Sequence, residues 1–195
     1  MKNNYTSPYS LTPISELKRD RESKINILIN NLKISEVKDD AKFIETSKRI
    51  KNSILLTLIE FGEPKFFDYE FEEIALSLQQ QLIGGVNRNH YYHKVSFPFT
   101  GDRELFSFQP ETFSYSSSDR GLIIPYSNNL TVTVDLPELN PDRAISEAKS
   151  LLSLTMQFIN INNASLQSWS LVTSQRIDEQ LRVKREELIK IFGDK

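Results

Sequence analysis

Apolar residues recur at steps of three and four along the first part of the chain, which is the spacing that places them on one face of an α-helix. The pattern predicts helices over residues 12–33, 40–61 and 68–83, preceded by a flexible N-terminal arm, residues 1–11. The first two patterns form either one bent helix or a helical hairpin that breaks near Ile34. We favour the break.

The period of the pattern changes from 3.6 to 2 within residues 90–136, which predicts a β-region there. The clearest strand covers residues 130–136, where Leu130, Val132 and Val134 alternate with threonine and aspartate. Because one side of this strand is apolar and the other is polar, we expect a small antiparallel sheet that is covered on one face only.

A last helical pattern covers residues 141–192 and meets no proline or glycine before Gly193. One unbroken helix of that extent is about 75 Å long at ~1.5 Å per residue, which is long for a domain of this size. We therefore expect either a kink around residues 160–163 or a far half that projects as a coiled-coil-like arm. Together these elements predict an α+β fold in which residues 12–195 form a single domain, with the sheet between the N-terminal helices and the long C-terminal helix.

The apolar side of the C-terminal helix is longer than one domain of this size easily covers. Leu181, Leu188 and Phe192 lie on it, and they predict an interaction helix that binds a protein partner or a second copy of the chain in an oligomer.

Composition excludes several classes of protein. An apolar fraction of 38% with 10% aromatic residues is typical of globular domains, and the absence of cysteine excludes disulfides, thiol nucleophiles and cysteine-ligated metals. The net charge of −2 gives no global reason to expect binding to nucleic acid or to an anionic membrane. No apolar run approaches the roughly 18 residues of a membrane span, and the first residues do not resemble a signal peptide, so we expect a cytoplasmic protein.

The two histidines, His90 and His93, suggest a metal site only if they share a face. In the strand predicted here their odd separation sends the rings to opposite faces, so we expect no metal and no cofactor. We find no catalytic constellation and expect a protein that is not an enzyme. An enzyme with a carboxylate pair remains an alternative, because sequence alone does not show which carboxylates lie close in space.

Basic and aromatic residues are mixed around the start of the β-region, at Arg88, Tyr91, Tyr92 and Lys94. Such a mixture can follow a phosphate backbone and stack on bases, so a nucleic-acid-binding domain is a second alternative. Further along, Gly101 and Asp102 lie between two apolar segments, and we expect them to form a structural turn.

The second half of the chain, about residues 95–190, resembles the N-terminal region of prokaryotic proteins that carry a restriction-endonuclease-like nuclease domain and look like components of antiphage defence. The resemblance rests on the alternating strand at 130–136, on the basic helix end Arg182-Val183-Lys184-Arg185, and on the segment Phe97-Pro98-Phe99-Thr100-Gly101-Asp102-Arg103-Glu104-Leu105-Phe106.

The resemblance implies a non-catalytic sensing or assembly module of a prokaryotic defence system, associated with a nuclease effector and acting by protein–protein contact. The sequence stops at Lys195 without a nuclease domain, so no catalytic residue is carried over. The chain is then expected to be either an excised N-terminal module or a stand-alone relative that works through a partner.

Overall fold

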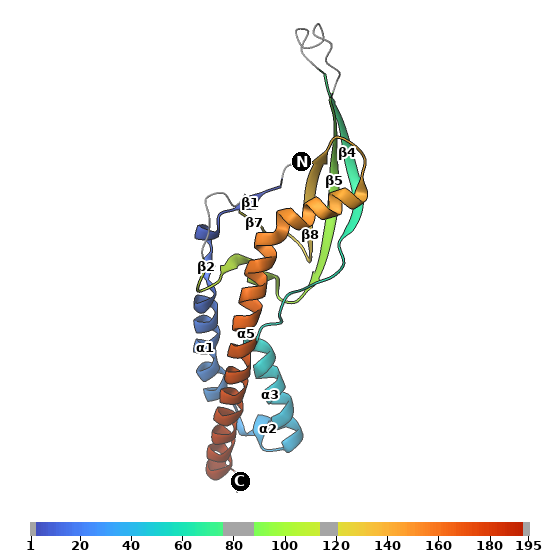
Figure 1. Ribbon diagram of the computed structural model, residues 1–195. Helices are drawn as coiled ribbons and strands as arrows, with labels where there is room; N and C mark the ends of the chain where they lie inside the picture. Colours follow the sequence, from blue (N-terminus) through green and yellow to red (C-terminus); the bar gives the residue numbers. More distant parts are fainter. Residues whose placement is uncertain (1–2, 76–87, 114–120, 193–195) are drawn as a thin grey trace.

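The computed structural model describes residues 3–75, 88–113 and 121–192 and has an α+β fold, as the sequence predicts (Figure 1). The elements follow one another along the chain as β1 (Tyr5–Thr6), the short 3-10 helix η1 (Pro8–Ser10), β2 (Thr12–Pro13), α1 (Ile14–Asn30), α2 (Ile34–Val37), α3 (Asp40–Ile54), β3 (Glu60–Phe61), β4 (Lys65–Ile74), β5 (Arg88–Thr100), η2 (Arg103–Ser107), β6 (Phe108–Gln109), β7 (Leu122–Ile123), β8 (Asn129–Leu136) and α5 (Pro141–Phe192).

Strand β5 is the centre of an antiparallel sheet, with β4 on one side and β8 on the other. Val95 fixes the register, because it lies opposite Phe66 of β4 and Val132 of β8. The alternate residues of β5 and β8 on this side are buried and pack on the first half of α5, which crosses the sheet in Figure 1. One face of the sheet is therefore the wall of the first hydrophobic core.

A second hydrophobic core lies where α5 runs beside α1, α2 and α3 (Figure 1). Its centre contains Ile25 of α1, Ile54 of α3 and Ile177 of α5, each at most 1% exposed. The far half of α5 is thus one member of a helical bundle, and the expectation that it projects as an arm is wrong. Asn30 ends α1 and Ile34 begins α2, so the predicted break near Ile34 is confirmed.

Helix α5 continues through Asn162 and Asn163, where a kink was one of the two expectations. Asn162 donates from Nδ2 to the carbonyl of Phe108 at 2.9 Å, and Asn163 bonds both the N–H and the carbonyl of Ile59. The two asparagines therefore connect α5 to the segments that contain Phe108 and Ile59. Figure 1 shows α5 bending in its first half without a break in the ribbon.

The largest correction concerns the helix expected at residues 68–83. Residues 65–74 form β4, and residues 76–83 lie outside the described part of the chain. The apolar steps from Phe67 to Phe71 and Ile74 fit a helix, but Tyr69 and Phe71 also alternate with acidic residues at period 2. Pairing with residues 88–96 of β5 decides in favour of the strand.

The N-terminal segment is docked on the domain, contrary to the expected flexible arm. β1 pairs antiparallel with β7, and β2 pairs with β6. Asn3 adds two hydrogen bonds to β8, because its carboxamide accepts from the N–H of Thr133 and donates to the carbonyl of Thr133, both at 2.7 Å.

The predicted second helix is also shorter than expected, since α3 ends at Ile54 and the chain is irregular up to β3.

Candidate functional site

The outer halves of β4 and β5 form an arm, defined here as residues 68–74 and 88–94. Its tip, residues 72–74 and 88–90, extends beyond the pairing of β5 with β8. Figure 1 shows the ends of both strands reaching beyond β8 and away from the helical bundle. The ladder pairs Asp68 with Lys94 at the base of the arm and Ile74 with Arg88 at its tip. Since paired residues point to the same side of a sheet, the arm has two sides of fixed composition.

One side of the arm is aromatic. Tyr91 of β5 lies between Tyr69 and Phe71 of β4, with ring centroids 6.0 Å and 5.0 Å away. Tyr69 is 43% exposed and Phe71 is 52% exposed, so these rings reach solvent beyond the point where α5 covers the sheet. Single exposed apolar residues are ordinary, but a contiguous exposed aromatic group on a projecting strand is typical of a contact surface.

The other side of the arm is acidic, with Asp68, Glu70 and Glu72 in a row along β4. Lys94 of β5 bonds the first two carboxylates, each at 2.8 Å. Its ammonium holds the pKa of Asp68 and of Glu70 below the usual range, and the two carboxylates in turn raise the pKa of Lys94. All three groups are therefore charged at neutral pH.

The same side continues toward β8. Tyr92 donates its hydroxyl to Glu72 at 2.9 Å, and this hydrogen bond raises the pKa of the phenol. His90 places Nδ1 2.9 Å from Asp135 of β8. On this side, carboxylates of both outer strands thus lie on either side of the β5 residues that include Lys94.

The four residues considered for nucleic-acid binding do not form one surface. Tyr91 lies on the aromatic side and Tyr92 on the acidic side, because neighbouring residues of a strand point in opposite directions. The ammonium of Lys94 is already bonded to two carboxylates, and Arg88 begins β5 opposite Ile74. A phosphate backbone along this side would meet the acidic row.

The histidines lie on opposite sides of β5, as strand parity predicts. His93 is fully buried, with Nδ1 2.8 Å from the carbonyl of Tyr91, and its Nε2 accepts from the N–H of Asn140 at 3.0 Å. These two hydrogen bonds fix the start of α5 on the sheet, a role of His93 that the sequence did not reveal. Within residues 3–75, 88–113 and 121–192, no three histidine, cysteine or acidic side chains gather where they could hold a metal ion.

Two of the three residues proposed for the interaction helix are covered. Leu181 is fully buried and Leu188 nearly so, both in the second core, whereas Phe192 is 46% exposed at the last described turn. The apolar stripe that suggested a partner is therefore occupied by α1, α2 and α3 of the same chain. The prediction that Leu181 and Leu188 offer a free surface is wrong.

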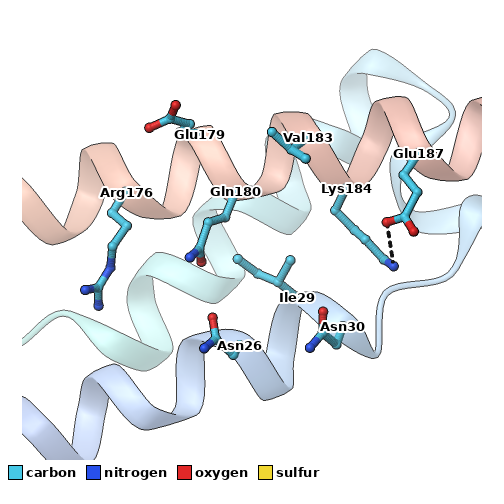
Figure 2. A pocket seen from close by; sticks show the side chains of 9 residues that line it. All are labelled: Asn26, Ile29, Asn30, Arg176, Glu179, Gln180, Val183, Lys184 and Glu187. Carbon is cyan, nitrogen blue, oxygen red and sulfur yellow. Dashed lines mark hydrogen bonds and ion pairs between the residues drawn. The ribbon is translucent and has the colours of Figure 1, made fainter.

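A groove of about 460 Å³ separates α1 from α5 (Figure 2). Figure 2 shows the carboxamides of Asn26, Asn30 and Gln180 around Ile29, with Val183 at the rim. Among its charged residues, Lys184 pairs with Glu187 at 3.0 Å and Arg176 pairs with Glu22 at 3.4 Å. A second cleft, of about 650 Å³, lies between Asn3, β8 and the first turns of α5. Neither contains a recognisable catalytic arrangement.

Gly101 and Asp102 form a turn directly after β5, and hydrogen bonds hold this turn against the segment that follows α3. Gly101 has φ +96°, a conformation that favours glycine. The N–H of Thr57 donates to the carboxylate of Asp102 at 2.7 Å, and the N–H of Asp102 donates to the carbonyl of Thr57 at 3.0 Å. The carboxylate of Asp102 therefore satisfies a backbone N–H group 45 positions away.

Among the described helices, none is both long and apolar enough to cross a membrane. Comparison of the chain with models of protein families, with curated proteins and with solved structures gives no match.

Proposed function

We propose that this chain is a non-catalytic sensing or assembly module of a prokaryotic defence system, acting in the cytoplasm by protein–protein contact and associated with a nuclease effector. The defence assignment rests on the sequence resemblance over residues 95–190. The protein-contact role rests on one observation of the structure, the exposed aromatic side chains of Tyr69 and Phe71 on the projecting arm.

The arm supports this role better than the C-terminal helix does. Leu181 and Leu188 already contribute to the second core, so a partner could reach them only after the bundle opened. Tyr69 and Phe71 need no such rearrangement, because about half of each side chain is exposed and their strand is held in register by β5. Aromatic residues of this kind give large contact area for few rotatable bonds, which makes them frequent binding hot spots.

The test is co-expression of the chain with the products of the neighbouring genes, followed by size-exclusion chromatography with light scattering. We expect one neighbouring product to co-elute with the chain. The double variant Tyr69→Ser/Phe71→Ser should lose that complex and keep the wild-type circular dichroism, because both rings lie outside the buried cores.

The matched control is Leu171→Ser/Val172→Ser on α5, which removes two apolar side chains that are 64% and 65% exposed. This control should leave the complex intact. Co-elution that survives the arm substitutions and fails with the α5 substitutions would place the contact on α5. A chain that forms a complex with none of the neighbouring products would refute the defence assignment.

A further inference from the structure

The two edge strands of the sheet, β8 and β4, differ in how their outward-facing backbone groups are covered. At the β8 edge, the carboxamide of Asn3 bonds the N–H and the carbonyl of Thr133, as a neighbouring strand would. At the other edge, the described residues give β4 no partner except β5. Proteins usually shorten, cover, bulge or charge such an edge. β4 has a bulge between Phe66 and Asp68 and a row of acidic residues, but it is ten residues long, contains no proline, and is paired without a further bulge from Asp68 to Ile74.

A free edge of this kind can accept one more strand. In an antiparallel ladder every second residue of β4 directs its N–H and carbonyl away from β5, toward the open side. An extended segment laid against β4 would bond these groups, and its side chains would alternate between the two sides of the sheet.

The two sides of β4 specify the side chains of that segment. Between Asp68 and Glu72, those directed to one side would lie beside Asp68, Glu70 and Glu72, and those directed to the other beside Tyr69 and Phe71. At the tip, Glu73 shares the side of Phe71 and Ile74 shares the side of Glu72. Directly opposite cross-strand pairs are stabilised by opposite charges and by apolar contact. The complement of β4 is therefore a strand in which basic and apolar residues alternate.

Charge argues against a second copy of β4 as the occupant. Two identical edge strands related by a two-fold axis share the same sheet faces, so the acidic row of one would lie beside the acidic row of the other. Like charges directly opposite one another are destabilising. Lys94 cannot relieve this repulsion, because it lies one strand away on β5, bonded to Asp68 and Glu70.

We propose that the free edge of β4 binds an extended segment of the partner protein in which lysine or arginine alternates with apolar residues, by adding that segment to the sheet as a further strand. The inference rests on the proposed protein-contact function and names the chemistry of the segment that is bound. Asp68, Glu70 and Glu72 select the basic residues, and Tyr69 and Phe71 select the apolar ones.

Synthetic peptides test the proposal directly on the purified chain. An eight-residue peptide of alternating lysine and valine should bind at least about tenfold more tightly than one of alternating glutamate and valine, and added salt should weaken its binding. A peptide of four lysines followed by four valines has the same composition without the alternation, and it should also bind at least about tenfold more weakly than the alternating lysine peptide.

Two further measurements locate the binding. Hydrogen exchange followed by NMR should show new protection at every second amide between Asp68 and Ile74, because only the outward-pointing N–H groups gain partners. The variant Asp68→Lys/Glu72→Lys should weaken binding of the alternating lysine peptide at least about tenfold. Glu179→Lys, a reversal on α5, should not change it, and thermal unfolding of both variants confirms that they fold.

Equal affinity for the lysine and glutamate peptides, or binding without protection of β4 amides, overturns the proposal. A wild-type dimer that Asp68→Lys/Glu72→Lys converts to a monomer makes a second copy the occupant and also overturns it. Failure of all peptides, while the neighbouring gene product still requires Tyr69 and Phe71, refutes strand addition alone. If the chain binds the alternating lysine peptide but forms a complex with none of the neighbouring gene products, only the defence assignment is refuted.

Discussion

Substitution of Gly101 by alanine tests the turn that closes the base of the sheet. A Cβ atom at residue 101 would lie 2.1 Å from the carbonyl oxygen and 2.7 Å from the carbonyl carbon of Leu58. Both are backbone atoms, so no side chain can rotate to make room. The turn also has φ +96°, where any residue with a Cβ is strained.

The expected loss of stability follows from these two effects. A left-handed conformation costs a non-glycine residue about 1–2 kcal/mol. Separation of residue 101 from Leu58 also breaks the two hydrogen bonds between Thr57 and Asp102, each contributing about 0.5–1.5 kcal/mol. Together they predict that Gly101→Ala lowers the free energy of unfolding by about 2–5 kcal/mol, whereas Asp102→Ala lowers it by about 0.5–2 kcal/mol.

Gly62→Ala is the matched control. A Cβ atom there would lie 3.2 Å from Cγ of Pro98, a side-chain atom, and Gly62 does not adopt a positive φ. Its substitution should change the free energy of unfolding by less than about 1 kcal/mol. Urea unfolding followed by circular dichroism measures all three variants. If Gly101→Ala and Gly62→Ala have the same midpoint, the close approach to Leu58 does not constrain residue 101 and the reasoning fails.

Three further predictions concern the cores and the arm. Leu181→Asp places a carboxylate in the second core and should cost about 3–5 kcal/mol in urea unfolding; a variant as stable as wild type would show that this core does not form. His93→Ala removes the acceptor for the N–H at the start of α5 and should cost about 1–3 kcal/mol, with His93→Phe no better, since a benzene ring cannot accept that bond. Hydrogen bonds from Lys94 lower the pKa values of Asp68 and Glu70 in the folded chain, so these bonds stabilise the arm above the unfolded pKa values, near pH 4, and that contribution is lost as pH falls through the folded values. Carboxyl NMR titration should show both midpoints shifting up in Lys94→Met.

The elements that the sequence predicts well are those with one buried side. Strand β8 and most of α1 place apolar residues against a core at a regular period, so the local pattern reports the structure directly. β4 lacks this constraint because most of its side chains are exposed, and no burial selects between a period of 2 and a period of 3.6. The alternation of Asp68, Glu70 and Glu72 with Tyr69 and Phe71 was the signal that could have revealed the strand.

Long-range partners explain the other differences. The stripe through Leu181 was visible in the sequence, but nothing local indicates that helices near the N-terminus return to cover it. Asn162 and Asn163 are poor helix formers, which made a break there reasonable. Their hydrogen bonds to Phe108 and Ile59 compensate for that weakness, and those partners lie 54 and 104 positions away.

The exposed arm is rigidly defined even though much of its surface is in solvent. Val95 is fully buried and aligned with Phe66 on one side and with Val132 on the other, so a shift of β5 by one residue would turn this side chain out of the core. The register fixed at the base extends along the ladder, and with it the separation of aromatic from acidic side chains between Asp68 and Glu72. A binding segment therefore meets a preorganised surface, which reduces the conformational entropy lost on binding.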